Sequence, residues 1–220
     1  MKILILGGNG MIGSNLSNFL NKENEIVISS REKQFLRKSK NCILFEAEKF
    51  EKQKSNLLGF DIIINAIGIT NKISSTDLKS MYYVNSIFVL SLHNFCKFNN
   101  IKLIHLSTNC VFSGVYKNKF KEYDIKDAID LYGHSKSLSE INSKYQLTLR
   151  FSCLGIETKK QKQLFNWYIS QKKTIDGFSN VYYNGITTLV LSEIIDLIIS
   201  KHFNLNGIMN LASNKIISKF

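Results

Sequence analysis

The sequence predicts an α/β fold in which helices cover both faces of a doubly wound parallel sheet. Short apolar runs alternate with amphipathic segments of helical spacing along most of the chain. The first run, residues 2–6, leads directly into a glycine-rich turn and a helical pattern. Polar residues follow other runs, at Asn65 and at Ser107-Thr108. An uninterrupted apolar run is typical of a strand buried on both faces, as parallel sheets require.

The glycine-rich turn is Gly7-Gly8-Asn9-Gly10-Met11-Ile12-Gly13, and the helix expected after it has Leu16 and Leu20 on one side. Such glycines allow a tight turn, close approach of the backbone to a pyrophosphate, and close packing of helix on strand. The helix start adds unpaired N–H groups and a positive dipole end. The pattern predicts a Rossmann-type dinucleotide site. The expected cofactor contacts in this turn are Gly7, Gly10, Met11, Ile12 and Gly13.

The second strand, expected over residues 25–29, bears on the choice of cofactor. An acidic residue at its end binds the ribose 2′-OH of NAD, whereas an Arg suits the 2′-phosphate of NADP. Ser30 and Arg31 stand there and favour NADP(H). Glu32 follows directly and leaves NAD(H) open, because it would compete if it turned inward.

The next elements lead to the expected carboxyl edge of the sheet. Strands are expected over residues 42–45, 61–64, 101–106 and 147–151, and a helix over 76–98. Small residues, among them Ala66 and Gly68, follow the fourth strand where the chain would pass under the cofactor. Asn85 reads as an exposed polar residue of the helix. The fifth strand delivers Thr108 to the edge where open parallel sheets bind ligands.

Tyr132 and Lys136 are the candidate catalytic pair. A polar loop over residues 113–129 leads into a helix expected to run to about residue 145. Side chains four apart leave a helix on one face. An ammonium beside a phenol favours the phenolate, so we expect a lowered pKa for Tyr132. Such a phenol can protonate a carbonyl oxygen while hydride moves at carbon, and Thr108 could hold the same oxygen.

After Gly155 the pattern changes. We expect a helix over residues 160–171 with Trp167 in the core, and a loop over 176–185. An amphipathic helix through Val190 and Ile198 and a strand over 207–211 follow. The predicted organisation is a dinucleotide-binding domain over residues 1–152 and a small, partial substrate lobe over 153–220.

Composition excludes several classes of protein. With 220 residues, 44% of them hydrophobic and 21% charged, the chain reads as globular rather than disordered. The net charge of +12 is spread over the chain without a basic arm, so we expect no nucleic acid partner. The four cysteines show no paired spacing, so neither a disulfide framework nor a metal site is expected. We find no signal peptide and no apolar run of the ~20 residues that a membrane span needs, so a cytoplasmic protein is expected.

Taken together, these motifs resemble the extended short-chain dehydrogenase/reductase family, most closely dTDP-4-dehydrorhamnose reductases and related sugar-nucleotide reductases. The resemblance covers essentially the whole chain. It implies NADPH-dependent reduction of the 4-keto group of a nucleotide-linked 6-deoxy sugar, in surface polysaccharide biosynthesis, with a homodimer as one option. The segments that carry it are the glycine turn, 65–68, Asn85, 106–114, 132–140, 149–152 and 184–189.

The resemblance also implies roles for single residues. Tyr132 would be the general acid, Lys136 would lower its pKa and bind the nicotinamide ribose, and Thr108 would bond the reacting oxygen. Asn85 would serve the cofactor site. Asn109, Cys110 and Asn184 would contact the sugar nucleotide, although many relatives have Asp-Tyr where this chain has Asn109-Cys110. The family usually continues some tens of residues further, so we expect a truncated substrate lobe.

Competing interpretations differ mainly at Asn109-Cys110. Sugar-nucleotide dehydratases need a carboxylate pair there, which excludes that reaction, and Ser30-Arg31 disfavours an NAD-retaining 4-epimerase. An epimerase-reductase resembling GDP-fucose synthases would use a Cys at position 110. It would also need a His in the substrate lobe, so a buried, inert Cys110 is expected instead. A non-catalytic, NADP-binding regulatory subunit on the same fold is a further alternative.

Overall fold

The computed structural model describes residues 1–21, 23–38, 41–70, 77–115, 119–156 and 164–219. Its centre is a sheet of seven parallel strands. These are β1 (Lys2–Leu6), β2 (Glu25–Ser30), β3 (Cys42–Leu44), β4 (Ile62–Asn65), β5 (Lys102–Leu106), β6 (Gln146–Arg150) and β10 (Gly207–Asn210). The strand order is β10-β6-β5-β4-β1-β2-β3, with every pairing parallel. The predicted doubly wound sheet is therefore confirmed.

The order of the strands reverses between β1 and β4, because the chain first moves outward through β2 and β3 and later outward through β5 and β6. Ligands of open α/β sheets bind outside the carboxyl ends of the strands at such a reversal. The ends of β1, β4 and β5 carry the glycine turn, Asn65 and Thr108 respectively. The topology thus gathers at one edge the segments that the sequence had singled out.

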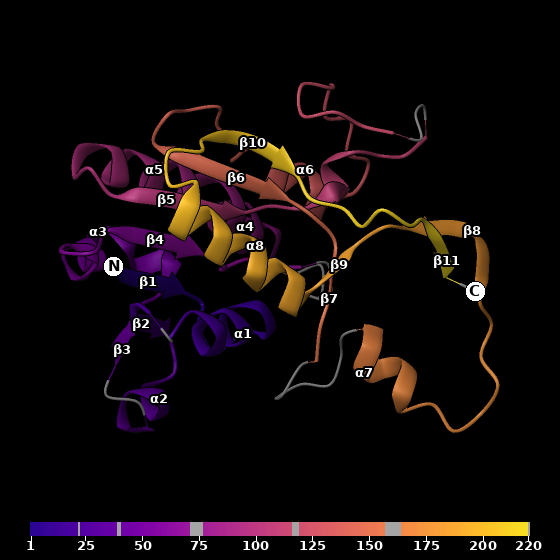
Figure 1. Ribbon diagram of the computed structural model, residues 1–220, viewed down its shortest axis with the longest axis horizontal. Coiled ribbons are helices and arrows are strands. Elements are labelled where there is room, and N and C mark those ends of the chain that lie inside the picture. The colour runs from indigo at the N-terminus through magenta and orange to yellow at the C-terminus, as the bar shows by residue number, and fades with distance from the viewer. Residues whose placement is uncertain (22, 39–40, 71–76, 116–118, 157–163, 220) are drawn as a thin grey trace.

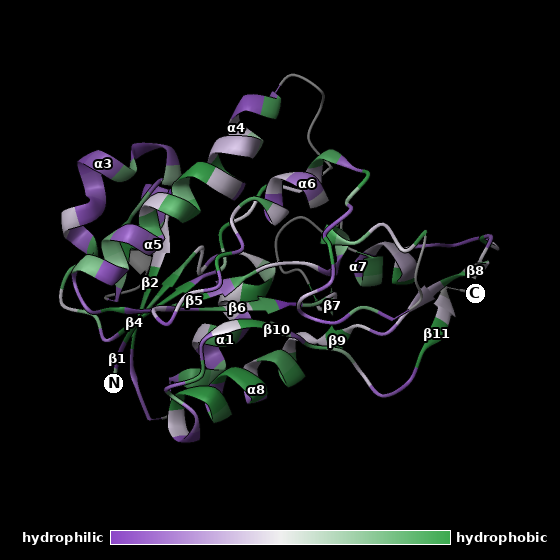
Figure 2. Ribbon diagram, turned by 90° about the horizontal axis from the view of Figure 1, so that it is seen from above, coloured by the Kyte–Doolittle hydropathy of each residue, from purple (hydrophilic) through white to green (hydrophobic). Residues whose placement is uncertain are grey.

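Helices cover both faces of the sheet, as Figure 2 shows. Alternate residues of β1 serve the two layers: Ile3 and Ile5 face one apolar core, and Leu4 and Leu6 the other. The first core is covered by α1 (Met11–Leu20) and α8 (Thr188–Lys201), the second by α3 (Phe50–Gln53) and α5 (Phe88–Phe98). The shorter helices are η1 (Ala47–Lys49), η2 (Lys54–Leu57), η5 (Asn109–Val111), α2 (Lys33–Lys38) and α6 (Leu131–Ser137).

The long helix expected over residues 76–98 is interrupted. It consists of α4 (Leu78–Tyr82), a π-helical turn η4 (Tyr83–Ile87) and α5, and residue 76 lies outside the described residues. Such turns are rare and often stand at functional sites. Asn85 lies within η4 and is fully buried, so the interpretation of this residue as an exposed polar one is wrong.

Beyond residue 152 the chain forms two small sheets. Strand β7 (Cys153–Leu154) pairs with β9 (Ile186–Thr187), and β8 (Phe178–Tyr183) pairs antiparallel with β11 (Ile217–Lys219). The loop prediction for residues 176–185 is wrong, because the partner of β8 lies far along the chain and local sequence does not reveal it. Helix α7 (Leu164–Ile169) occupies part of the expected helix, whose residues 160–163 lie outside the described ones. Trp167 is 44% exposed rather than in the core.

Part of the chain beyond residue 152 packs on the central sheet. Helix α8 buries Leu191, Ile195 and Ile198 in the first core, and β10 pairs with β6. Residues 188–210 therefore return to the central sheet. In Figure 1, β8 and β11 lie side by side and α7 lies apart from them, all three on the carboxyl side of the sheet. We propose that these elements form the small lobe.

Candidate active site

The glycine turn fits a phosphate-bearing ligand. Gly7 has a φ of +78°, which favours glycine, and its carbonyl accepts a hydrogen bond from the Gly10 N–H at 3.0 Å. A Cβ on Gly13 would lie 2.3 Å from the Gly7 oxygen, and a Cβ on Gly8 2.4 Å from the Cβ of Ile28. No side chain caps the start of α1 at Gly10. Its first N–H groups and dipole are thus left for an anionic ligand, with Met11 and Ile12 in the first turn.

Glu32, rather than Arg31, contacts the glycine turn at the end of β2. The Asn9 Nδ2 lies 3.4 Å from the Glu32 Oε1, to which it donates, whereas the Arg31 side chain is exposed. Ser30 is buried, and its hydroxyl accepts from the Glu32 N–H at 3.0 Å. The inward turn of the acid that the sequence left open is the arrangement found here.

The segment after β4 borders the same turn. A Cβ on Gly7 would lie 3.2 Å from the Ala66 carbonyl oxygen, and one on Gly68 would lie 3.6 Å from the Asn85 Oδ1. The Asn85 amide accepts from the Ile69 N–H at 2.9 Å and donates to the Ile69 carbonyl at 2.8 Å. It also donates to the Ser135 hydroxyl at 3.0 Å. Asn85 therefore ties this segment to α6.

Thr108 and Tyr132 are brought together by η5 and α6. Thr108 is buried at the end of β5, and its Oγ1 accepts from the Cys110 N–H at 3.2 Å. It lies near the Tyr132 phenol, on whose pKa it acts. Gly133 permits this approach, because a Cβ there would lie 2.1 Å from the Cys110 carbonyl oxygen. The structure thus places Thr108 near Tyr132, and their catalytic roles stay a prediction.

The expected lowering of the Tyr132 pKa is wrong. Burial raises the pKa of Tyr132 to about 12, with nearby Cys110 adding to the rise and the Thr108 hydrogen bond opposing it. Lys136 does share the face of α6, but its ammonium reaches the sheet, where Nζ donates to the Leu106 carbonyl at 2.7 Å. It is only 3% exposed, and burial lowers the pKa of Lys136 to about 8.

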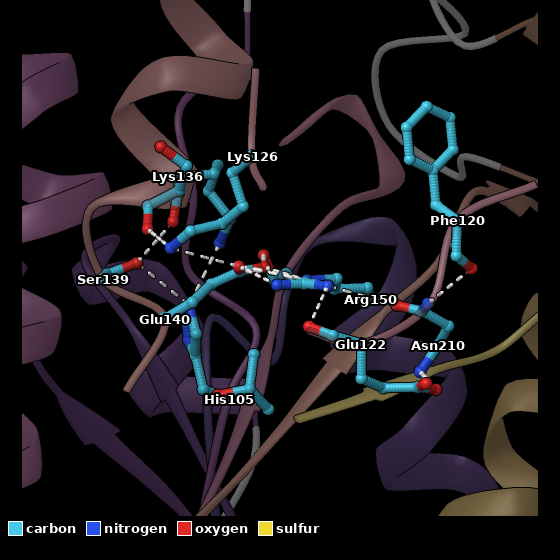
Figure 3. A network of polar contacts seen from close by, with 12 residues as sticks. His105, Phe120, Glu122, Lys126, Lys136, Ser139, Glu140, Arg150 and Asn210 are labelled. Carbon is cyan, nitrogen blue, oxygen red and sulfur yellow. Dashed lines mark hydrogen bonds and ion pairs between the residues drawn. The ribbon is translucent and has the colours of Figure 1, made fainter. Parts of the chain in front are cut away.

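A buried ion pair supports the catalytic segment, and sequence reasoning missed it (Figure 3). The Arg150 Nη2 donates to the Glu140 Oε2 at 2.8 Å, and the two side chains are 2% and 0% exposed. The Ser107 hydroxyl donates to the Glu140 Oε1 at 2.7 Å. The pair thus joins the ends of β5 and β6 to the segment after α6. Its signal in the sequence is an Arg within the apolar run 147–151.

Of the expected sugar contacts, Asn109 is bonded to Ser152. The Ser152 hydroxyl donates to the Asn109 Oδ1 at 3.0 Å, and its carbonyl accepts from the Ile186 N–H at 2.9 Å. Asn184 lies two residues before Ile186 and is half-buried. Cys110 is exposed, so the expectation of a buried Cys110 is wrong. A cavity of about 70 Å³ nearby is lined by Met11, Cys153, Leu154, Gly155, Leu164, Phe165 and Tyr183.

Comparison with known proteins identifies the family. The RmlD substrate binding domain family matches residues 1–161, well over half of the chain, and the protein belongs to this family. No curated protein sequence gives a significant match.

Solved structures share the fold. A hypothetical dTDP-4-dehydrorhamnose reductase from Sulfolobus tokodaii is 24% identical, with a TM-score of 0.81, over 100% of this chain and 79% of that one. The Bacillus anthracis dTDP-4-dehydrorhamnose reductase in complex with NADP is 20% identical, with a TM-score of 0.82, over 99% and 77%. The UDP-N-acetylglucosamine 4-epimerase from Methanobrevibacter ruminantium in complex with UDP-N-acetylmuramic acid is 20% identical, with a TM-score of 0.81, over 99% and 78%. The fold is thus shared by reductases and epimerases of nucleotide-linked sugars.

Proposed function

We propose that this protein reduces the 4-keto group of a nucleotide-linked 6-deoxy sugar with NADPH, in the biosynthesis of surface polysaccharide sugars. The observation that carries the proposal is that Thr108 lies near Tyr132 at the carboxyl edge of the sheet, with the Lys136 amine on the Leu106 carbonyl at the end of β5. The glycine turn lies at the same edge. A proton donor beside a dinucleotide site is the arrangement that carbonyl reduction requires.

The residues of the glycine turn fit a dinucleotide. A Cβ at Gly8 or Gly13 would collide with neighbouring atoms, and the start of α1 lacks a cap. The candidate contacts are Gly7, Gly10, Met11, Ile12, Gly13, Ser30, Arg31, Ala66 and Gly68, with Tyr132 and Lys136 at the nicotinamide end. The cofactor supplies the hydride when bound. The NADP named with the Bacillus anthracis neighbour favours NADP(H) here, and Glu32 against the turn keeps NAD(H) as the alternative.

Tyr132 supplies the proton in this proposal. Because its pKa is raised to about 12, the phenol is protonated at neutral pH and can donate as negative charge develops on the substrate oxygen. The Thr108 hydroxyl, fixed by the Cys110 N–H at 3.2 Å, holds the same oxygen. Lys136, one helical turn after Tyr132, donates its Nζ to the Leu106 carbonyl at 2.7 Å. The phenol passes its proton directly to the substrate oxygen.

The proposed substrate lies over Asn109, Cys110 and Asn184. Asn109 and Cys110 are exposed in the first part of η5, and Ser152 links Asn109 to the segment that follows Asn184. The sugar nucleotide named with the epimerase neighbour supports this class of ligand. No helix of the described residues has the length and apolarity needed to cross a bilayer. We place the reaction in the cytoplasm, with a homodimer as one arrangement and no nucleic acid partner.

An epimerase-reductase is the second candidate, because Cys110 is exposed and close enough to Tyr132 to raise its pKa. Such an enzyme would also move protons at the carbons beside the keto group. His134 is the histidine of the catalytic segment, and its Nδ1 lies 3.0 Å from the Tyr82 hydroxyl. His93 and His105 are buried. These contacts favour simple reduction.

The test is NADPH oxidation by the purified protein with dTDP-, GDP- and UDP-linked 4-keto-6-deoxy sugars. Oxidation with one of them, without exchange of solvent deuterium into the sugar ring, supports reduction. Oxidation with such exchange identifies the epimerase-reductase. NADPH binding without oxidation of any of the three contradicts catalysis and indicates a regulatory subunit.

A further inference from the structure

His105 is a buried titratable residue that the proposed mechanism does not use. It lies on β5 with 0% of its surface exposed. Its Nδ1 is 3.2 Å from the Asn65 Nδ2, and its Nε2 is 3.4 Å from both the Lys136 Nζ and the Ser139 Oγ. Figure 3 shows His105 close to Lys136 and Ser139 in one network. The imidazole therefore connects β4 to the catalytic lysine.

The contacts of Asn65 decide which ring nitrogen carries the hydrogen. The Asn65 Oδ1 accepts from the Ile67 N–H at 3.1 Å, which turns the amide nitrogen toward His105. An amide nitrogen only donates, so the Nδ1 of His105 must accept and the hydrogen must sit on Nε2. This Nε2–H faces the Ser139 hydroxyl and the Lys136 amine. A backbone N–H of the β4 segment thus fixes the tautomer.

The tautomer matters for Lys136, because an ammonium also only donates. The Ser139 hydroxyl donates to the Lys136 carbonyl at 2.9 Å and can accept from the Nε2–H at 3.4 Å. The hydrogen of this N–H also lies near the Lys136 Nζ, 3.4 Å from Nε2, where it opposes a positive charge on the amine and suits the neutral form. The Leu106 carbonyl accepts from Nζ in either state. The pKa of His105 lies well below its usual range through burial and the nearby Lys136, so the ring stays neutral.

Other titratable groups also face Lys136. Glu140 favours the ammonium but does not outweigh burial, and the pKa of Lys136 falls to about 8. The Glu140 carboxylate is already bonded to Arg150 at 2.8 Å and lies 3.6 Å from the Lys126 Nζ. The phenol of Tyr132 is neutral at physiological pH because its pKa is about 12. Asn65 and Ser139 carry no charge.

We propose that His105 is a positioning residue that, held in its Nε2–H tautomer by Asn65, favours the neutral form of Lys136 and so lets this lysine exchange its proton near neutral pH. The consequence for turnover rests on the proposed function. The effect on Lys136 itself does not, because it can be measured without substrate.

The first test is ¹⁵N NMR of the imidazoles in the full chain, with the His105 signals assigned by their loss in His105→Gln. We expect His105 to show the Nε2–H tautomer alone and no titration between about pH 5 and 9, where ordinary histidines change charge. A Nδ1–H tautomer or a titration in that range would overturn the proposal. Asn65→Leu should yield a mixture of tautomers, and an unchanged single tautomer in that variant would also contradict it.

The second test follows the proton on Lys136 by ¹³C NMR of labelled lysine, assigned with Lys136→Met. We expect His105→Leu to raise the titration midpoint of Lys136 by about one pH unit. His105→Gln, which can keep an N–H near the same place, should restore the midpoint. Equal midpoints in the unmodified protein and His105→Leu would overturn the proposal.

If the proposed reaction is observed, the alkaline limb of the plot of kcat/KM against pH should shift in His105→Leu by the same amount as the titration midpoint of Lys136. An unshifted limb in His105→Leu would contradict the proposal. Absence of turnover in the unmodified protein would count against the proposed function alone, since the NMR results still decide the role of His105.

Discussion

The two halves of the candidate site use different chemical groups, backbone atoms in one and buried charged side chains in the other. The glycine half, at the ends of β1 and β4, uses backbone groups and the absence of side chains: Gly7, Gly8 and Gly13 leave space that a Cβ would fill. The catalytic half, at the ends of β5 and β6, uses buried charged groups, including Lys136, Glu140 and Arg150. Backbone shape is set locally, whereas the charge state of a buried group depends on everything packed around it.

The largest effect is expected where the catalytic half is held together. Glu140→Gln removes one partner of the buried pair and leaves Arg150 uncompensated, which should cost about 3–5 kcal/mol in the free energy of unfolding. Urea denaturation followed by circular dichroism measures this. Glu51→Gln is the matched control, because its pair with Lys54 is 69% and 47% exposed and should change stability by less than about 0.5 kcal/mol. If Glu140→Gln and Glu51→Gln lost the same free energy of unfolding, the buried pair would be no more important for stability than the exposed one.

Lys136→Met should stabilise the fold while impairing function. Because burial lowers the pKa of Lys136 from 10.5 to about 8, the folded ammonium is costly below pH 8. Removing it should raise the free energy of unfolding by about 2 kcal/mol at pH 7, after the lost bond to Leu106 is subtracted. This gain in the free energy of unfolding should shrink as pH rises above about 8, because Lys136 is then neutral in the folded unmodified protein and its burial costs less.

The exposed Lys79→Met serves as the control for that experiment and should show no such pH dependence. The midpoints of urea unfolding, measured between pH 7 and 10 for both variants, show whether the gain in stability depends on pH. A loss of stability in Lys136→Met at pH 7 would show that the ammonium is well compensated.

In the glycine half, a single methyl group should disturb cofactor binding. Gly13→Ala puts a Cβ 2.3 Å from the Gly7 oxygen, and the turn must shift to relieve it. We expect NADPH affinity to fall about 10- to 100-fold, matching the 1–3 kcal/mol typical of overpacking. Ser17→Ala adds no bulk to the same helix and should leave the Kd unchanged. Fluorescence titration that finds normal affinity in Gly13→Ala would count against this half of the site.

The smallest effect concerns cofactor choice. Arg31 is exposed, so its contribution to NADPH over NADH should be about 1 kcal/mol and should disappear in Arg31→Ala. Glu32→Gln should shift the preference toward NADPH, because it removes a carboxylate bonded to Asn9 beside the turn. Titrations with both cofactors check this. A preference that neither change alters would show that the end of β2 does not select the cofactor.

The features that the sequence predicted are those set by local sequence, and the features it missed are those set by packing between distant segments. The strands, the glycine turn and the shared face of Tyr132 and Lys136 depend on local periodicity and were predicted. The pKa of Tyr132 and the burial of Asn85 depend on packing between α6, η4 and η5, which neighbouring residues do not encode. Likewise β8 pairs with a strand far along the chain, and α8 returns to the central sheet after the small lobe.

The most direct test compares NADPH oxidation, with the sugar nucleotide that supports it, by the unmodified protein and by Tyr132→Phe. The substitution keeps the ring and removes the proton, so turnover should fall 10²- to 10⁴-fold, as is typical of general acid catalysis. NADPH affinity and unfolding should stay unchanged. Tyr82→Phe, which removes the hydroxyl bonded to His134 beside the same helix, should retain activity. Near-normal turnover by Tyr132→Phe would contradict the assignment of Tyr132 as the proton donor.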